Sequence, residues 1–188
     1  LYDSYRQLVN AAHTNNNIVC FDPNFRIDLW RGKEAEFVEK CHYFLSFSQL
    51  VKVSEEELLL LTGETEQNQA CSKLHEFGVQ FVLETLGSKG CLVSEGVSNT
   101  VVPAYEIDAI DTTGAGDSFI GAILCQLASD LKGETLTTKR LEGFVQYASK
   151  VSALVCSQLG AMSSLPTPED LSRIALKLKT PKKKKKDR

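Results

Sequence analysis

Short apolar runs alternate with helical stretches along most of this chain, and this alternation restricts the fold more than any other feature. Ile18–Phe21, Leu50–Val53 and Gln80–Leu86 have the length and composition of buried strands. Between the last two, Ser54 and Glu57 form the S-x-x-E pattern that opens a helix. Strands that alternate with helices predict an α/β fold with a mostly parallel sheet covered by helices on both faces.

The remaining elements follow from the same spacing arguments. Tyr43–Phe47 is predicted as an extended segment, and Gly96 with the alternation after it predicts a hairpin and an outer strand. Neither an internal repeat nor a domain linker precedes the lysine-rich end. The predicted helices are Asp3–His13, Lys33–Lys40, Glu66–Phe77, Gly116–Ser129, Thr138–Cys156 and Pro168–Leu178.

Charge and composition narrow the range of partners. The formal net charge is −3, and residues 181–188 contribute five Lys, one Arg and one Asp, or +5, so the rest carries −3 − 5 = −8. An acidic body argues against a nucleic-acid surface. The tail is predicted to be disordered, with an anionic-surface patch as the alternative. With no apolar run of membrane length and six scattered cysteines, we expect a cytoplasmic protein with reduced thiols and no membrane partner.

The run DTTGAGDSF, residues 111–119, places two glycines and two carboxylates where a loop enters a helix. Gly114 and Gly116 let backbone N–H groups point into one concavity, and the first helical turn adds unpaired donors and the positive end of the helix dipole. Such a nest suits a transferring phosphoryl group. Asp117 would repel a bound phosphate, which makes it a candidate base for an attacking hydroxyl. The simpler alternative is a glycine turn followed by a capping Asp.

The whole string, together with the small apolar helix face after it, resembles the second signature of the PfkB/ribokinase family of sugar kinases. The resemblance implies a ribokinase-like three-layer α/β/α fold and ATP-dependent phosphorylation of a sugar hydroxyl. It makes Asp117 the base and a substrate contact, and it assigns the N–H groups of Ala115, Gly116 and Asp117 to the transferring phosphoryl group. It also places Gly114 and Gly116 at the catalytic centre and beside the ATP. The family's glycine-rich first signature and its lid strands do not occur here, so we interpret residues 1–180 as the C-terminal portion of a PfkB carbohydrate kinase domain.

FDPNFR, residues 21–26, follows the first predicted strand. Asp-Pro-Asn is a strong turn former, so a plain strand-ending turn is the simpler alternative. Followed by Leu29 and Trp30, the segment resembles one found in fructokinases and 2-keto-3-deoxygluconate kinases. This resemblance implies that Asn24 and Arg26 bind the substrate, since a guanidinium can clamp an oxygen-rich group with two hydrogen bonds.

Two further motifs follow strands. In KVSEEELLLLTG, Glu57 matches the Glu of the family's N-x-x-E, which holds magnesium through water, although Ser54 stands where many members have Asn. TLGSKG resembles the family's T-x-G-x-x-G, which implies that Thr85, Gly87 and Gly90 contact the ATP phosphates. A capped helix and a tight hairpin are the simpler alternatives.

VCSQLGAMSS, residues 155–164, resembles the loop that donates carbonyl groups to a potassium ion in ribokinase relatives. The resemblance implies a monovalent-cation site made by Asp111, Thr113, Gly160 and Ser164. A helix C-cap at Gly160 is the alternative, and dependence on K⁺ is left open.

The resemblance therefore covers nearly all of Ile18–Pro166, with DTTGAGDSF and four further motifs in family order, and it implies an ATP-dependent carbohydrate kinase that uses ATP and Mg²⁺. Fructose is the first choice of sugar, and 2-keto-3-deoxygluconate, another sugar or a nucleoside comes second. A non-catalytic fructokinase-like binding protein is the alternative from another class, which the intact Asp117 and glycines disfavour. Homodimerisation of the whole protein and activity of this portion alone are left open.

Overall fold

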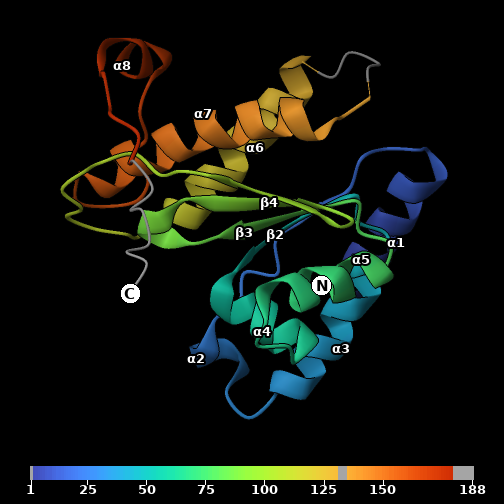
Figure 1. The fold of residues 1–188 in the computed structure, drawn as a ribbon. Coiled ribbons are helices and arrows are strands. Elements are labelled where there is room, and N and C mark those ends of the chain that lie inside the picture. Colours follow the sequence, from blue (N-terminus) through green and yellow to red (C-terminus); the bar gives the residue numbers. More distant parts are fainter. Residues whose placement is uncertain (1, 131–134, 180–188) are drawn as a thin grey trace, which may run out of the picture. The chain divides into compact units, whose positions relative to one another are not determined.

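The computed structural model describes residues 2–130 and 135–179, and the predicted basic tail at 181–188 lies outside the described residues. The chain divides into two compact units. The first comprises Leu1–Leu86 with Leu92–Thr100, and the second comprises Gly87–Cys91 with Val101–Arg188. Each unit is described by itself, with the element labels of Figure 1.

Strands and helices follow one another in nearly the order that the apolar runs predict. The strands are β1 (Cys20–Phe21), β2 (Leu50–Ser54), β3 (Phe81–Thr85), β4 (Cys91–Glu95) and β5 (Ser98–Val102). The helices are α1 (Tyr2–Thr14), α2 (Ile27–Trp30), α3 (Glu34–Leu45), α4 (Glu55–Thr62), α5 (Gln67–Glu76), α6 (Ala115–Asp130), α7 (Thr138–Cys156) and α8 (Pro168–Arg173), with a 3₁₀ turn at Gly87–Lys89.

The strands form one mixed sheet in the order β1-β2-β3-β4-β5. The pairs β1–β2 and β2–β3 are parallel. The short connections on either side of β4 leave no room for a crossover, so β4 runs antiparallel to both β3 and β5, as in a meander. The expected hairpin is thus confirmed, and an outer strand is present, but it is β5 at Ser98–Val102 and does not follow the alternation from Val101 to Ile107 that predicted it. Because Phe21 pairs with Val51 and Ser54 with Thr85, the carboxyl ends of β1, β2 and β3 meet at one edge.

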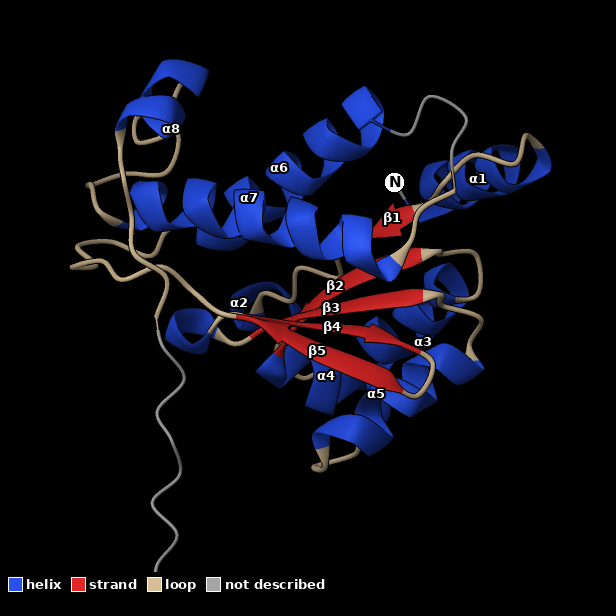
Figure 2. Cartoon of the chain, turned by 45° about the horizontal axis from the view of Figure 1, so that its top comes forward, coloured by secondary structure: helices blue, strands red, loops and turns tan. Residues whose placement is uncertain are grey.

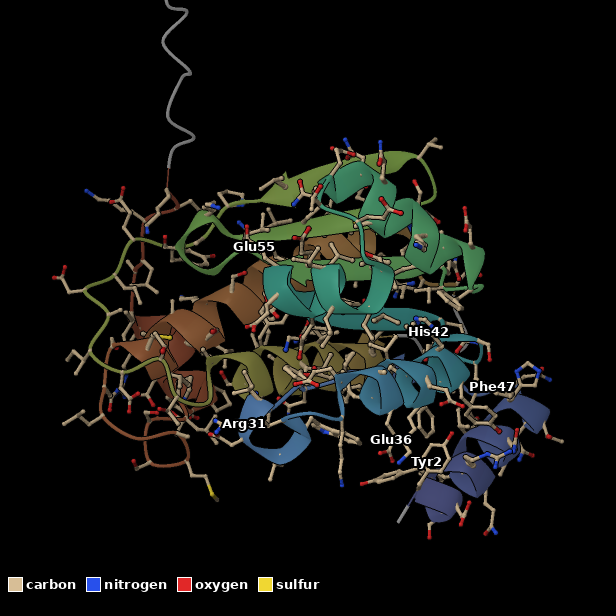
Figure 3. All side chains as sticks on the ribbon, turned by 90° about the horizontal axis from the view of Figure 1, so that it is seen from below. Tyr2, Arg31, Glu36, His42, Phe47 and Glu55 are labelled. Atoms are coloured by element: carbon tan, nitrogen blue, oxygen red, sulfur yellow. The ribbon has the colours of Figure 1, made fainter. Side chains whose placement is uncertain are left out.

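Helices α3, α4 and α5 lie on one face of this sheet (Figures 1 and 2). Phe37, Cys41 and Leu45 recur every four residues and form the buried stripe of α3. The predicted extended segment at Tyr43–Phe47 is therefore wrong, because α3 continues to Leu45. Aromatic side chains of this segment pack against α1, where Tyr2 meets Tyr43 and His13 meets Phe47 (Figure 3).

Helices α6 and α7 pack against each other in the second unit. Their buried positions include Phe119, Ile123, Leu141 and Val145. The prediction that the last helix reaches Leu178 is wrong.

Helix α8 stops at Arg173 because Ile174 is extended, and the following chain pairs with the segment before α6. The backbone amide of Lys179 donates to the Ala104 carbonyl at 2.8 Å, and the backbone amide of Glu106 donates to the Lys177 carbonyl at 2.7 Å. In residues 2–130 and 135–179, no helix has the length and apolarity needed to cross a membrane.

Two exposed glycines, Gly63 and Gly143, allow a test of where helix α4 ends. Gly63 caps α4 with a φ of 71°, whereas Gly143 lies inside α7, and an added Cβ meets nothing within 4 Å at either position. We expect Gly63→Ala to lower the free energy of unfolding by about 1 kcal/mol, because left-handed backbone disfavours a side chain. Gly143→Ala is the matched control and should raise it by roughly 0.5–1 kcal/mol, because alanine restricts the unfolded chain. Urea unfolding measures both, and equal effects of the two substitutions would contradict the assigned helix end.

Candidate active site

The turn after β1 is shaped by Asp22. Its Oδ1 accepts a hydrogen bond from the Asn24 amide at 3.1 Å, which closes an Asx turn. Asn24 has a φ of 49°, a left-handed conformation that Asn tolerates better than most side chains. The backbone therefore changes direction at Asn24 and leads into Phe25 and Arg26.

Lys52 of β2 anchors this turn through an ion pair. Its Nζ lies 3.3 Å from Oδ1 and 3.2 Å from Oδ2 of Asp22. Burial raises the pKa of the Asp22 carboxyl above its ordinary value, and the Lys52 charge opposes that rise. No predicted site included Lys52, although a lysine in the middle of the apolar strand LVKVS is a visible signal in the sequence.

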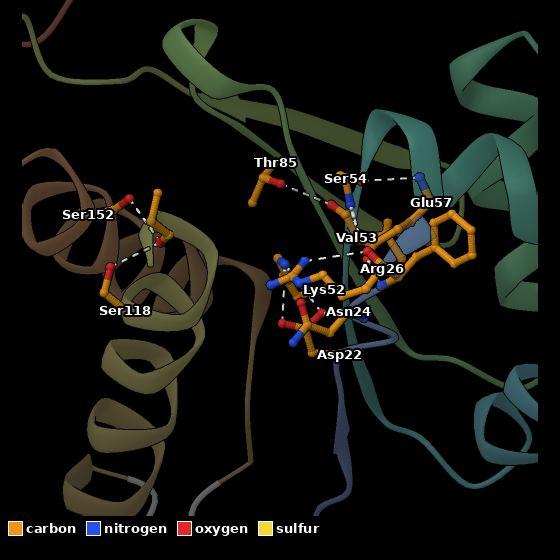
Figure 4. Close-up of polar contacts among 12 residues, drawn as sticks. Asp22, Asn24, Arg26, Lys52, Val53, Ser54, Glu57, Thr85, Ser118 and Ser152 are labelled. Atoms are coloured by element: carbon orange, nitrogen blue, oxygen red, sulfur yellow. Dashed lines mark hydrogen bonds and ion pairs between the residues drawn. The ribbon is translucent and has the colours of Figure 1, made fainter. Parts of the chain in front are cut away.

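Glu57 joins the turn to the start of α4. Its Oε2 accepts from the Ser54 amide at 2.8 Å, and the Ser54 side chain accepts from the Glu57 amide at 3.1 Å, so the predicted capping box is present. Its Oε1 accepts from the Phe25 amide at 2.7 Å (Figure 4). The buried carboxylate thus satisfies two backbone donors from different segments, and this explains why Glu57 is buried at the end of a sheet.

Arg26 and Thr85 differ in how firmly they are held. Arg26 is exposed, and its guanidinium donates to the neighbouring Phe25 carbonyl at 3.4 Å. Thr85 ends β3, and its hydroxyl donates to the Val53 carbonyl at 3.2 Å (Figure 4). In the first unit the fold therefore gathers Asn24, Arg26, Glu57 and Thr85 around the carboxyl ends of β1, β2 and β3.

The start of α6 forms the centre of the second unit's site. The Ala115 amide donates to the Thr112 carbonyl at 3.2 Å, and the Ser118 amide donates to the Gly114 carbonyl at 2.8 Å. The amides between them, those of Gly116 and Asp117, are first-turn donors without an acceptor inside the helix. The predicted nest therefore has two available amides rather than three, because that of Ala115 closes the preceding turn.

The glycine pair of the motif also divides its roles differently from the prediction. Gly114 has a φ of 78°, so it makes the turn, whereas Gly116 has no positive φ and lies inside α6. Hydroxyls fix the position of this helix start, because both Ser118 and Ser152 of α7 donate to the Ala115 carbonyl, at 3.0 and 3.1 Å (Figure 4). Ser152 was not among the predicted site residues, because no local sequence pattern marks it.

Asp117 is exposed and lines a cavity of about 420 Å³ within the second unit. Gly114 lies beside it, and the rest of the lining is largely apolar. The lining residues are Gly114, Asp117, Ser118, Gly121, Ala122, Cys125, Tyr147, Val151, Ala161, Met162, Leu165, Pro166, Pro168 and Leu171.

The four residues predicted to bind a monovalent cation form one cluster in the second unit. Asp111 accepts from the Thr113 amide at 2.9 Å and from the Gly160 amide at 3.0 Å. Hydrogen bonds from the Thr113 side chain, the Thr113 amide and the Gly160 amide hold the pKa of Asp111 below its ordinary value. The Ser164 hydroxyl donates to the Gly160 carbonyl. A carboxylate, a hydroxyl and a carbonyl that lie together are the oxygen ligands that hard cations prefer.

Gly87 and Gly90 have different surroundings in the second unit. An added Cβ at Gly87 meets nothing within 4 Å, which leaves room for a ligand. At Gly90 it would lie 2.1 Å from the Val102 carbonyl oxygen and 2.9 Å from the Ala104 nitrogen. Gly90 is therefore required for close packing of the backbone, and Gly87 is the stronger of the two candidates for a phosphate contact.

The sequence matches the family described as pfkB family carbohydrate kinase over residues 2–168. It is 33% identical over 172 residues to the probable fructokinase-4 of Arabidopsis thaliana, and the aligned region covers 91% of this chain and 52% of that protein. The fructokinase of Vibrio cholerae O395, solved with fructose, ADP and calcium ion bound, has a TM-score of 0.82 at 32% identity over 90% of this chain and 54% of that one. A double mutant of it, solved with fructose, ADP and potassium ion, has the same TM-score at 31% identity and the same coverage. The chain spans about half the length of these relatives, and the likeness confirms the ribokinase-like α/β fold class.

The close approach of Ala161 to Gly114 can be tested by substitution. A Cβ at Gly114 would lie 2.7 Å from that of Ala161, at a φ of 78°. We expect Gly114→Ala to lower the free energy of unfolding by about 1–3 kcal/mol, because it combines steric overlap with backbone strain. Gly121→Ala is the control, since the same addition on α6 meets nothing within 4 Å. Thermal unfolding of both variants measures the difference, and a Gly114→Ala variant as stable as Gly121→Ala would contradict the close approach.

Proposed function

The chain belongs to the pfkB family of carbohydrate kinases, and we propose that the whole protein transfers phosphate from ATP to a hydroxyl of fructose. In this proposal, residues 1–180 form the C-terminal portion of the kinase domain. The observation that carries it is the start of α6, where the exposed Asp117 carboxylate stands beside two first-turn amides with no acceptor in the helix. A carboxylate and a set of N–H donors at one helix end match the needs of a hydroxyl nucleophile and a phosphoryl group.

The proposed chemistry uses each part of the helix start once. Asp117 takes the proton from the sugar hydroxyl as the oxygen attacks the γ-phosphoryl group. The amides of Gly116 and Asp117, with the positive end of α6, stabilise the charge on the transferring phosphoryl. Because Ser118 and Ser152 both hold the Ala115 carbonyl, these amides are fixed before the substrate arrives. Fixed dipoles need no reorganisation during the reaction, which is the main source of such catalysis.

Asn24 and Arg26 are the proposed contacts to the sugar or to the transferring phosphate. Both are exposed, and both follow a turn that Asp22 and Glu57 hold in place. The choice of fructose is supported by the Vibrio cholerae fructokinase, which was solved with fructose bound.

ATP and two cations complete the proposal. Thr85 and Gly87 are the proposed contacts to the ATP phosphates, since Gly87 has open space on its Cα. Glu57 is the proposed partner of hydrated Mg²⁺: each of its oxygens already accepts one backbone amide and keeps a further lone pair for a water ligand. When bound, Mg²⁺ would neutralise charge on the phosphate oxygens. K⁺ would be held by the cluster of Asp111, Thr113, Gly160 and Ser164, and the Vibrio cholerae double mutant was solved with potassium ion.

The decisive assay measures ADP formation by the whole protein with fructose, 2-keto-3-deoxygluconate and a nucleoside as alternative substrates. We expect the highest kcat/KM with fructose, and turnover with none of them would favour a non-catalytic binding protein.

A cytoplasmic location is proposed on the six free thiols. A homodimer is proposed for the whole protein, and light scattering would reveal it.

Asp117→Asn tests the base. The substitution keeps the shape of the side chain and removes its basicity, so the turnover number of the whole protein should fall by on the order of 10²–10⁴-fold. Binding of ATP, measured by calorimetry without sugar, should hardly change. Asp108→Asn replaces another exposed carboxylate of the same unit and serves as the control. Near-full turnover in Asp117→Asn would remove this residue from the mechanism.

Arg26→Lys tests the substrate contact. The change keeps the positive charge and loses the planar fork, so sugar-dependent turnover should drop clearly while ATP binding without sugar is retained. The control is Arg31→Lys, because Arg31 forms an exposed ion pair with Asp28 near the other end of α2. If Arg26 serves only the turn, both variants should show unchanged kinetics and stability within about 0.5 kcal/mol of the parent.

A further inference from the structure

Lys52 is a charged residue in a strand that is otherwise apolar and buried. Leu50, Val51 and Val53 of β2 have no exposed surface, and Lys52 keeps 6% of its own. The side chains of Lys52 and Asp22 are 8% and 15% exposed, and the ammonium straddles both carboxylate oxygens. Asp22 holds the turn that carries Asn24, and Lys52 has no role in the chemistry proposed above.

Stability alone is a poor reason for such a pair. Removing two charges from water costs several kcal/mol per ion, and an apolar pair of similar volume often gives an equally stable or more stable protein. An apolar residue at position 52 would also match its neighbours in the strand, since parallel strands covered on both faces are usually continuous apolar runs. What an ion pair supplies, and an apolar contact does not, is a fixed direction for the carboxylate.

The direction of the Asp22 carboxylate decides the path of the next four residues. The same Oδ1 that Lys52 contacts accepts from the Asn24 amide, and Asn24 sits at a φ of 49°. One residue further on, the Phe25 amide is held by Glu57. The segment therefore has two tethers to the sheet edge, one from β2 through Lys52 and one from α4 through Glu57 (Figure 4).

The side chains of Asn24 and Arg26 extend from this tethered backbone and are held less firmly than the backbone itself. Both are exposed, and the long side chain of Arg26 contacts only its neighbour's carbonyl among the hydrogen bonds described. A guanidinium can bind a substrate in a defined geometry only if the backbone that carries it is fixed.

We propose that Lys52 is a positioning residue for sugar phosphorylation: its ion pair with Asp22 fixes the turn at Asn24 and thereby aims Asn24 and Arg26 at the substrate. This inference rests on the proposed function. Lys52 itself contacts neither ATP nor sugar in this arrangement, and it acts through the Asp22 carboxylate.

The test measures steady-state kinetics of the whole protein carrying Lys52→Met, Lys52→Arg or Lys73→Met. Lys52→Met keeps the length of the side chain and removes the charge, so the KM for the sugar should rise by on the order of 10- to 100-fold while the KM for ATP stays unchanged. Lys52→Arg can still pair with Asp22 and should recover most of the loss. Lys73→Met is the control, because Lys73 pairs with Glu64 on the surface of the same unit.

A merely structural role predicts a different pattern. Loss of folded protein lowers the concentration of active enzyme, so kcat would fall with both substrates and the two KM values would stay the same. Lys52→Met kinetics equal to those of Lys73→Met, or a fall in kcat alone, would overturn the inference while the parent's activity upheld the proposed function. A parent without sugar-dependent turnover would overturn both.

A second variant covers the case in which Lys52→Met does not fold. Asp22→Asn keeps the size of the side chain and the acceptor for the Asn24 amide but removes the charge that holds Lys52. We expect the same selective rise in the KM for the sugar, and in the double variant with Lys52→Arg the recovery by arginine should be lost. An unchanged sugar KM in folded Asp22→Asn would overturn the inference.

Discussion

The carboxylate of Glu57 is the contact on which the first unit's site depends. One oxygen closes the capping box with Ser54, and the other holds the Phe25 amide 32 residues away in sequence. Helix α4 and the turn after β1 are thereby fixed by the same buried group, at the edge where three strands end. A single acceptor that satisfies two buried donors is costly to replace, because its loss would leave both amides without a partner.

Local signals explain how much of this could be predicted from the sequence. The capping box of α4 and the span of α7 follow from short-range rules about caps and spacing, and both are present as predicted. The wrong predictions concern segments whose secondary structure depends on contacts with distant parts of the chain. The aromatic run at Tyr43–Phe47 has the composition of a strand, yet packing against α1 keeps it helical through Leu45.

The candidate site shows the same division. Motif spacing predicted Asp117, Glu57 and the cluster of Asp111, Thr113, Gly160 and Ser164 as candidates, but it could not distinguish Gly87 from Gly90 or Gly114 from Gly116. Those distinctions depend on φ angles and on how closely other backbone segments approach. Lys52 and Ser152 were missed for a related reason: each acts through a partner at least 30 residues away in sequence, and no local pattern encodes such a pairing.

In the proposed mechanism, each unit supplies positive charge to a bound ligand, and the two units do so with different chemical groups. In the second, backbone amides at the start of α6 provide positive potential, and the helix itself keeps them in place. In the first, positive charge sits on the flexible side chain of Arg26, which loses conformational entropy whenever it is ordered. If the backbone that carries Arg26 is already fixed, less conformational entropy is lost when a ligand binds. In the proposed mechanism, this difference accounts for the buried Lys52 and Glu57 and the partly buried Asp22 around the turn that carries Arg26, and for the serine hydroxyls at the start of α6.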